Sequence, residues 1–283
     1  MEQSKIQNFW QTHPCGESFV GGLEKYGADY DRFFTDYDSF RYSTERHIPE
    51  CLEKADFDGK QTLEIGLGQG ADSEQLIRQG AKWYGLDLTA ESVKRVQIRL
   101  AIRNLPFKGI AQGSVLSLPF ADNAFDKVYS HGVLHHVPDI QQAQKEIHRV
   151  LKPDGELIAM LYAKNSLNYR LSIAVVRRLG LLAMYLTGRK ADGLVGQHLE
   201  NARQSGVLNY LKMSKFVHRN TDGALNPYSK VYDLATVERD FTNFIIEKSY
   251  KRFMHAPPFP IGKLPFEKLL GWHLWVHLRP RKS

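Results

Sequence analysis

The stretch TLEIGLGQGAD, from Thr62 to Asp72, places three glycines directly after a short apolar run. Glycine adopts backbone conformations that other residues avoid, so Gly66, Gly68 and Gly70 predict a tight turn whose backbone can approach a ligand closely. A strand that leads through such a turn into a helix is typical of open α/β sheets, in which ligands bind at the carboxyl ends of the strands. The stretch therefore predicts both a fold class and the place of a binding site.

Short apolar runs alternate with helical patterns from about Gly59 to Tyr162, which predicts a parallel sheet with crossover helices. The five expected strands are QTLEIG, KWYGLDL, FKGIAQG, FDKVYS and GELIAMLY. Further on, a helix in DLATVERDF and strands in FIIEKSYKRF and LLGWHLWVHLRP predict an antiparallel pair at the sheet edge. We expect four parts: an N-terminal helical cap (1–57), a binding core (58–162), a mainly helical insertion (163–232) and the C-terminal part of the core (233–283).

Charge and cysteine content narrow the function classes. The 283 residues include 38 Lys and Arg against 31 Asp and Glu, a formal net charge of +7. The basic groups are scattered in short clusters, which favours a solvated basic surface over nucleic-acid binding, with contact to an anionic membrane as the alternative. The chain has two widely separated cysteines and no apolar leader pattern, and its run from Leu171 to Leu186 is too short to span a bilayer. We therefore expect a cytoplasmic protein in a reducing compartment.

The glycine turn fits two binding patterns. Gly66, Gly68 and Ala71 satisfy the dinucleotide pattern G-x-G-x-x-G/A. The three glycines preceded by Glu64 satisfy the acidic-x-G-x-G-x-G pattern of enzymes that bind a methyl donor. Glu64 and Asp72 flank the turn, and each would repel a pyrophosphate about 6 Å away by roughly 2–3 kcal/mol. The same carboxylates attract an ammonium and tolerate a sulfonium, so the charges favour a cationic ligand, although Asp72 is alternatively a helix cap.

An acidic residue closes the second expected strand. Asp87 ends the run KWYGLDL, where a carboxylate can accept hydrogen bonds from both hydroxyls of a ribose. Thr89 is available to cap the helix that follows, so Asp87 is not needed for that purpose. We expect Asp87 to bind the ribose of an adenosine ligand, which fits either binding pattern.

Four motifs, LEIGLGQG, GLDLTAESV, LPFADNAFDKVYSHGVLHHVPD and RVLKPDGE, follow one another between about residues 60 and 162. In this stretch the chain resembles the class I S-adenosylmethionine-dependent methyltransferases, in particular a large bacterial branch of the methyltransferase type 11 kind. The resemblance implies a Rossmann-like, seven-stranded, mostly parallel sheet of order 3-2-1-4-5-7-6 with helices on both faces. It also implies S-adenosylmethionine as cofactor and S-adenosylhomocysteine as product.

The resemblance implies roles for individual residues. Glu64 is expected near the methionine ammonium, Asp87 on the ribose and Leu88 against adenine. Where many family members have GDA, with an acid facing the adenine amino group, this chain has GSV; Ser114 can still accept a hydrogen bond there, and the alternative is that adenine selectivity depends more on backbone groups. The expected cofactor-binding residues are Glu64, Gly66, Gly68, Gly70, Asp87, Leu88, Ser114, Val115 and Ser130.

The segment SHGVLHHVPD follows the fourth expected strand and should lie between cofactor and acceptor. Its imidazoles, His131, His135 and His136, can act as general bases near neutral pH, and His135 is the first candidate. The alternative is that the paired histidines pack this loop. Quinone-ring O-methyltransferases carry metal-binding acids in the same segment, and here Gly132 and His135 replace them, so we expect no metal site.

The acceptor pocket is expected from residues after the fifth strand and from the insertion, whose apolar helix would form a lid. The candidate acceptor-binding residues are Tyr162, Asn165, Tyr169, Arg219, Tyr228 and His255. The leading hypothesis is in-line transfer of a methyl group to an oxygen or nitrogen of a small, fairly hydrophobic metabolite. The alternatives are carbon methylation of a lipid or quinone at a membrane surface, and a non-catalytic cofactor- or RNA-binding module.

Overall fold

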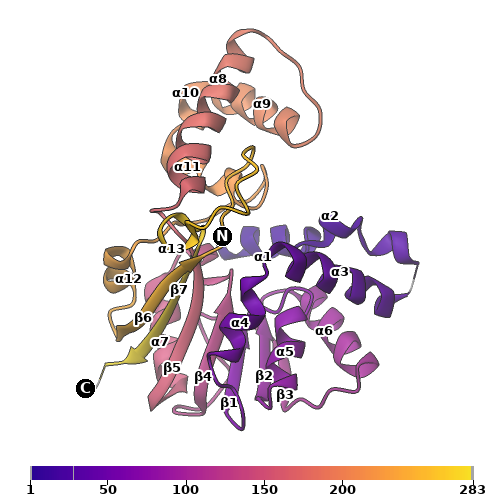
Figure 1. Ribbon diagram of the computed structural model, residues 1–283, viewed down its shortest axis with the longest axis vertical. Coiled ribbons are helices and arrows are strands. Elements are labelled where there is room, and N and C mark those ends of the chain that lie inside the picture. The colour runs from indigo at the N-terminus through magenta and orange to yellow at the C-terminus, as the bar shows by residue number, and fades with distance from the viewer. Residues whose placement is uncertain (1, 28, 282–283) are drawn as a thin grey trace.

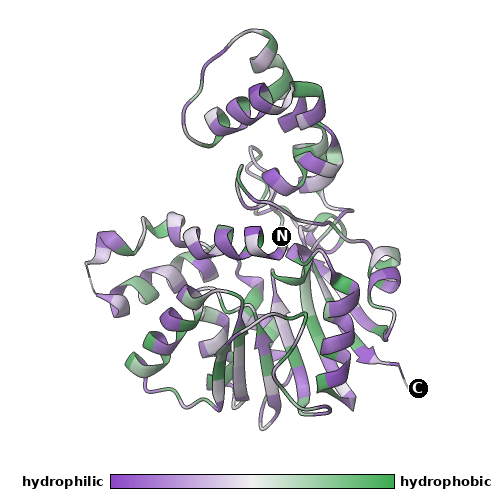
Figure 2. Cartoon of the chain, turned by 180° about the vertical axis from the view of Figure 1, so that it is seen from behind, coloured by the Kyte–Doolittle hydropathy of each residue, from purple (hydrophilic) through white to green (hydrophobic). Residues whose placement is uncertain are grey.

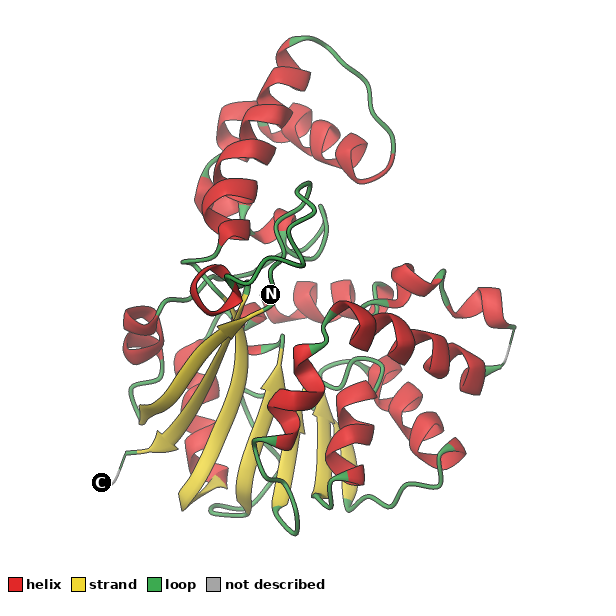
Figure 3. Ribbon diagram, in the orientation of Figure 1, coloured by secondary structure: helices red, strands yellow, loops and turns green. Residues whose placement is uncertain are grey.

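A computed structural model describes residues 2–27 and 29–281 and contains a seven-stranded sheet of order β3-β2-β1-β4-β5-β7-β6 (Figures 1 and 3). Strand β7 runs antiparallel to both of its neighbours, and the other pairings are parallel. The predicted fold class and strand order are confirmed. The strands are β1 (Gln61–Ile65), β2 (Lys82–Asp87), β3 (Gly109–Gln112), β4 (Phe125–His131), β5 (Leu151–Tyr162), β6 (Phe244–Arg252) and β7 (His273–Pro280).

Strand β5 begins four residues earlier than the sequence pattern suggests. Leu151 already pairs with Phe125, and the register then shifts between Phe125 and Lys127. This bulge lets the strand continue past Pro153, which cannot donate to a regular ladder. Proline therefore ends the preceding helix but does not delay the strand.

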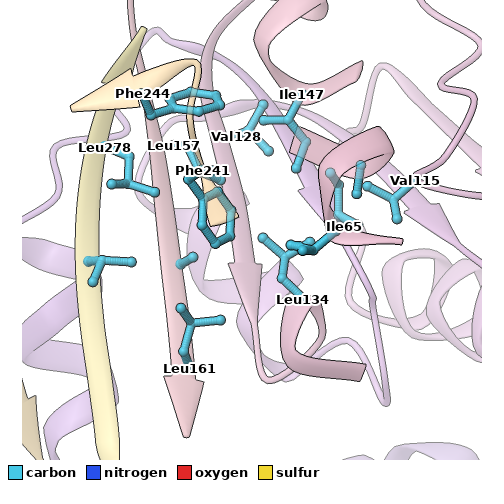
Figure 4. Close-up of a cluster of buried hydrophobic side chains, with 14 of the residues drawn as sticks. Ile65, Val115, Val128, Leu134, Ile147, Leu157, Leu161, Phe241, Phe244 and Leu278 are labelled. Atoms are coloured by element: carbon cyan, nitrogen blue, oxygen red, sulfur yellow. The ribbon is translucent and has the colours of Figure 1, made fainter. Parts of the chain in front are cut away.

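Helices cover both faces of the sheet (Figure 1). Helices α4 (His47–Glu53), α5 (Ala71–Arg78) and α6 (Ala90–Ile102) bury one face around Trp83 and Tyr129. Helices α7 (Ile140–Val150) and α12 (Leu234–Asp240) bury the other face, where Leu157 and Phe241 lie in an aliphatic and aromatic cluster (Figure 4). A sheet buried on both faces explains why its central strands are nearly continuous apolar runs.

Capping side chains begin the helices that follow the strands. Thr89 accepts a hydrogen bond from the backbone N–H of Ser92 (3.3 Å), so the predicted cap of α6 is confirmed. Asp139 accepts from the backbone N–H of Gln142 (3.0 Å) at the start of α7. These bonds satisfy donors that the first helical turn leaves unpaired.

The N-terminal segment lies across the carboxyl ends of the parallel strands (Figure 1). It forms α1 (Glu2–Thr12), α2 (Glu17–Val20), η1 (Leu23–Tyr26) and α3 (Tyr30–Thr44). Phe33, Phe34 and Tyr37 of α3 are buried in a cluster of its own, which also includes Ala71 at the start of α5. This packing attaches the segment to the rim of the sheet, where the sequence places the binding site.

Between β5 and α12 the chain leaves the core and forms helices. These are η3 (Asn168–Arg177), α8 (Arg178–Leu186), α9 (Gly193–Ser205), α10 (Val207–Tyr210), α11 (Met213–Phe216) and η4 (His218–Asn220). We call residues 168–216 the helical arm; it projects beyond the carboxyl ends of the strands (Figure 1) and contains both hydrophobic and hydrophilic residues (Figure 2). Ile173, Leu199 and Phe216 belong to a small core within the arm.

Two short helices complete the structure: η2 (Leu134–His136) after β4 and α13 (Glu267–Leu270) before β7. Within the described ranges, no helix combines the length and the apolar composition that crossing a membrane requires.

Candidate functional site

A cavity of about 380 Å³ lies at the carboxyl ends of β1, β2 and β4 and is bounded on its outer side by the N-terminal helices. Its volume falls in the range of pockets that hold small organic ligands. Most of its wall comes from the turns that follow the strands, as expected for an open α/β sheet. Its polar side chains and turn glycines include Gln3, Arg41, Glu64, Gly66, Gly68, Asp72, Asp87, Ser114, His131, Gly132 and His136.

The first two glycines of the turn lie on the cavity wall. Gly66 has φ of 82°, and its N–H donates to the carbonyl of Leu86 (2.8 Å). A Cβ at this position would lie 2.1 Å from Val133 Cγ2, so a larger residue would push apart the turns after β1 and β4. Gly68 has φ of 53° and leaves its backbone open to the cavity. The glycines therefore set the shape of the wall.

Two residues expected to bind the cofactor lie behind that wall. Gly70 precedes α5, and a Cβ there would lie 3.0 Å from Val96 and 3.1 Å from Arg99, so its smallness serves helix packing. Ser130 is buried within β4 and donates to the carbonyl of Ile65 (3.2 Å). Neither is among the described residues that line the cavity.

Glu64 lies near the carboxyl end of β1, and its side chain is buried at the cavity wall. One carboxylate oxygen accepts a hydrogen bond from the indole N–H of Trp83 (2.7 Å). Burial raises the pKa of Glu64 to about 8. A carboxylate in such a place gains most from a cationic ligand group, which would restore its ionised form.

Asp87 is the last residue of β2, and its carboxylate links the turn that follows β1 to the turn that follows β2. One of its oxygens accepts from the backbone N–H of Leu67 (2.7 Å), and the other accepts from the N–H and the hydroxyl of Thr89 (both 2.8 Å). Burial raises the pKa of Asp87. The carboxylate lines the cavity, and the oxygen that accepts from Leu67 keeps its second lone pair for a ligand, whereas the oxygen bonded to Thr89 uses both.

Asp72 is not a helix cap but one half of a buried ion pair. Arg41 from α3 donates to both of its oxygens (2.8 and 3.0 Å from Nη2), and the hydroxyl of Tyr129 donates to it as well (2.9 Å). Burial favours the neutral acid, but Arg41 and His131 outweigh it and hold the pKa of Asp72 below its usual value.

This ion pair contradicts the expectation that Glu64 and Asp72 both attract a cationic ligand. Asp72 does not present an uncompensated negative charge to the cavity, because Arg41 neutralises it. Glu64 thus remains as the carboxylate beside the turn that has no cationic partner among the described residues. Any preference of this cavity for a cationic ligand group would therefore come from Glu64 rather than from two flanking acids.

Helix α1 covers the end of the cavity that lies over β2 and β3. Gln3 donates to the hydroxyl of Ser114 (2.6 Å), and Gln7 donates to the carbonyl of Leu88 (2.9 Å). Leu88, Ser114 and Val115 line the cavity here, where the resemblance placed adenine. The hydroxyl of Ser114 accepts from Gln3 and also from the backbone N–H of Leu116 (3.1 Å), so both of its lone pairs are already used and it is not the free acceptor that was expected for adenine.

The three candidate histidines have different positions. His131 lines the cavity beside Arg41 (Nδ1 to Nη2, 3.2 Å), and burial lowers its pKa to about 3. His135, the first candidate for a base, is completely buried and stacks on Tyr162 with ring centroids 3.8 Å apart. Burial lowers the pKa of His135 well below its usual value, and it is not among the described lining residues. Its position corresponds to the packing alternative.

His136 lies on the cavity wall next to Trp10 of α1 (ring centroids 5.1 Å apart). Its Nδ1 lies 2.7 Å from the carbonyl of Tyr228, and because a carbonyl can only accept, Nδ1 carries a proton. Its Nε2 lies 3.3 Å from the carboxylate of Asp222, which also accepts from the hydroxyl of Tyr162 (2.7 Å). Burial opposes the ionised form of Asp222, but His136 outweighs it and lowers the pKa of this acid.

The remaining acceptor candidates do not lie on this wall. Asn165 accepts from Arg170 (2.6 Å) and borders a separate, smaller hollow beside β6. Tyr169 packs against the small core of the arm, and Arg219 lies over the ring of Tyr210. His255 stacks on Phe253, and burial lowers its pKa to about 4. Tyr162 and Tyr228 are not among the described lining residues: Tyr162 donates to Asp222, and the carbonyl of Tyr228 lies beside Nδ1 of His136.

Sequence reasoning missed Arg41, Trp10 and Asp222. Asp222 lies between the two predicted candidates Arg219 and Tyr228, in the stretch HRNTDGALNPYSKVYD. Arg41 and Trp10 lie in the N-terminal segment, which contains several aromatic and charged residues and offers no spacing that distinguishes these two. Their roles follow from the way α1 and α3 cross the sheet.

Residues 63–159 match a protein family described as "Methyltransferase domain". Sterol 24-C-methyltransferase of Gibberella zeae is 34% identical over 99 residues, which are 34% of this chain and 26% of that protein. Fatty-acid O-methyltransferase of Mycolicibacterium smegmatis is 34% identical over 117 residues, 41% of each chain. The aligned part thus spans a quarter to two-fifths of these relatives.

Among solved structures, an S-adenosylmethionine-dependent methyltransferase from Mesorhizobium loti is similar, with a TM-score of 0.53. The match covers 81% of this chain and 96% of the other at 17% identity. It supports the same sheet architecture.

Proposed function

Residues 63–159 make this chain a member of the class I S-adenosylmethionine-dependent methyltransferase family, and from this premise we propose that the protein methylates a small, largely apolar metabolite. One observation carries the proposal: Glu64 and Asp87, at the ends of two neighbouring strands, border the same cavity as the glycine turn. A carboxylate for an ammonium and a carboxylate for a ribose are the groups that S-adenosylmethionine requires.

The residues on the wall fit this cofactor. We assign Glu64 to the methionine ammonium, Asp87 to the ribose hydroxyls, and Leu88, Ser114 and Val115 to the adenine. Gly66 and Gly68 leave room for the ligand beside the backbone. When bound, the cofactor supplies an activated methyl group, and the side chains around it position the acceptor and exclude water.

Arg41 completes this assignment. It is the one Lys or Arg side chain among the described lining residues, and it lies near Glu64 and Asp72 at the glycine end of the cavity. An α-amino acid group needs a cation for its carboxylate beside an anion for its ammonium. We assign Arg41 to the methionine carboxylate, which it would share with Asp72.

For an acceptor that arrives protonated, the base is expected at His136. The carbonyl of Tyr228 holds a proton on Nδ1, whereas Nε2 is buried and faces the carboxylate of Asp222, so His136 would take up the acceptor's proton only as a pair with Asp222. His131 is less suited to this role because burial and the nearby Arg41 oppose its protonation. His135 lies behind His136 and would act by fixing the position of this loop.

We place methylation of an oxygen or nitrogen first because the pair His136–Asp222 could accept the proton that a hydroxyl or an amine loses. Carbon methylation of a lipid at a membrane is the second candidate, and the similarity to a sterol 24-C-methyltransferase supports it. Both candidates share an apolar acceptor.

Two measurements test the proposal. Titration calorimetry with S-adenosylmethionine and with NADH is expected to give binding of the first compound alone. A metabolite extract incubated with protein and a methyl-labelled donor is then expected to yield one labelled product, whose mass identifies the acceptor. Binding of NADH without binding of S-adenosylmethionine would refute the proposal.

A further inference from the structure

The basic excess of the protein is concentrated in the helical arm. Residues 168–216 contain 8 Lys and Arg against 2 Asp and Glu, a net charge of +6, whereas the whole chain has +7. The other 234 residues are therefore nearly neutral, with a net charge of +1. The charge that looked scattered along the sequence is collected on one projecting structure.

Exposed aliphatic side chains accompany these charges. Leu186 is 73% exposed, Leu194 is 55% exposed and Leu208 is 78% exposed, and Leu179 and Val195 are also exposed. The small core of the arm leaves these residues uncovered, and none of the large apolar residues exposed on the arm, all of which is described, is aromatic.

Both features meet at the far end of the arm. The connection from α8 to α9 is the part of the arm farthest from the sheet (Figure 1). Leu186 ends α8 and Leu194 is the second residue of α9, and Arg189, Lys190 and Asp192 lie exposed between them, a net charge of +1. Neither basic residue forms an ion pair with any residue in the described ranges. We call residues 186–195 the arm tip.

We propose that the arm tip binds the surface of an anionic lipid bilayer. Basic side chains are attracted to acidic headgroups, and exposed leucines beside them can enter the boundary between headgroups and acyl chains. A single-stranded nucleic acid would instead require exposed aromatic rings for base stacking, and the aromatic rings of the arm are buried or half-buried. Such binding requires no methyl transfer and is independent of the proposed function.

Vesicle binding by the full chain tests this inference. Vesicles of phosphatidylcholine with one-third phosphatidylserine are expected to co-sediment the protein at low salt. Pure phosphatidylcholine vesicles are expected to bind it weakly, and salt is expected to reduce binding to the anionic vesicles. Failure of the wild-type protein to bind anionic vesicles at low salt would overturn the inference.

Two tip variants and one control locate the contact. Each basic residue near an anionic surface strengthens binding about fivefold, so Arg189→Gln with Lys190→Gln is expected to weaken it by roughly 25-fold. Leu186→Ser with Leu194→Ser is expected to weaken it by about tenfold. Lys82→Gln with Lys108→Gln removes the same charge at exposed positions by the amino ends of β2 and β3, and is expected to keep wild-type binding.

All changed positions are exposed or at helix ends, so unchanged circular dichroism and melting temperature are expected for each variant. Equal vesicle binding by the arginine–lysine variant and its control would place the contact elsewhere and overturn the inference. Displacement of bound vesicles by a mixed-sequence single-stranded RNA would also overturn it, in favour of a nucleic-acid surface.

Discussion

Arg41 of α3 donates to both carboxylate oxygens of Asp72, the second residue of α5, so a helix outside the sheet supplies the counter-ion of the glycine turn. The side chains of both residues are largely buried. Removal of one partner would leave the other charge buried and unpaired, which typically costs about 3–5 kcal/mol. The pair therefore helps to hold the N-terminal segment on the sheet, and it also fixes the positions of two side chains on the cavity wall.

A double variant separates the two roles of Arg41. Arg41→Met alone is expected to lower the melting temperature, because Asp72 loses its counter-ion. Arg41→Met with Asp72→Asn is expected to regain most of that stability while S-adenosylmethionine still binds at least tenfold more weakly, because the methionine carboxylate has lost its cation. Calorimetry and thermal unfolding give both quantities, and wild-type affinity in the double variant would remove Arg41 from the binding site.

Binding of S-adenosylmethionine is expected to release a proton from Glu64. The pKa of this carboxyl is raised to about 8 by burial, so at pH 7 it is largely protonated before the ligand arrives, and the ligand ammonium favours the ionised form. Calorimetry at pH 7 in buffers of different ionisation enthalpy measures the released protons. Glu64→Gln, whose amide oxygen can still accept from Trp83, is expected to bind at least tenfold more weakly and to release no proton from this site.

The same carboxyl makes the unliganded protein less stable in mild alkali. Its pKa rises from an ordinary 4.5 to about 8 on folding, so between these values the folded protein binds the proton that the unfolded chain has lost. The contribution to the free energy of unfolding is then largest below pH 4.5 and falls as the pH rises through this window. Melting curves at pH 5 and pH 8 should show a smaller decrease for Glu64→Gln than for the wild type, and an equal decrease would contradict this explanation.

Asp87→Asn is expected to weaken S-adenosylmethionine binding by roughly ten- to a hundredfold, the range for loss of hydrogen bonds to a charged acceptor. The amide oxygen can accept from Leu67 or from Thr89 but not from both, and the amide nitrogen then faces the other N–H donor, so circular dichroism and the melting temperature check the fold. Asp154→Asn, an exposed acid between α7 and the centre of β5, is a matched control that should bind as the wild type does. Unchanged affinity of Asp87→Asn would show that the ribose lies elsewhere.

Asp222→Asn tests the proposed base. Loss of the carboxylate opposite His136 is expected to reduce kcat about a hundredfold for an acceptor that must be deprotonated, with little change in the affinity for S-adenosylmethionine. The assay uses the acceptor identified from the metabolite extract, and Asp192→Asn, an exposed acid of the arm, serves as control. A normal kcat would indicate an acceptor that reacts without a base.

The sheet and the glycine-turn side of the cavity were predictable because short-range patterns determine them. The alternation of apolar runs and helices indicates the parallel sheet. The place of Glu64, two residues before the first turn glycine, indicates that its carboxyl lies beside the cavity. Gly70 was the exception within the motif, since its spacing matches the ligand-binding glycines while its environment is the packing of α5 on α6. Spacing alone does not distinguish a glycine that faces a ligand from one that faces a helix.

The acceptor side was not predictable to the same degree because it depends on contacts between distant segments. His136 meets Asp222 across 86 residues of chain, and the pair forms only because the segment after the arm returns to the end of β4. His135 and His136 are adjacent and chemically identical in sequence, yet one stacks on Tyr162 and the other faces the cavity. The direction of each ring follows from a short helical turn that periodicity does not reveal.

The two glutamine bonds of α1 have a kinetic consequence. Gln3 and Gln7 hold the first helix on Ser114 and Leu88, so a nucleoside that leaves through that end of the cavity would do so only after both amides detach. The frequency of this detachment would set an upper limit on turnover, however fast the chemical step is. A bulky peptide fused ahead of this helix would accordingly change the exchange of product for fresh donor while leaving the melting temperature of the sheet unaffected.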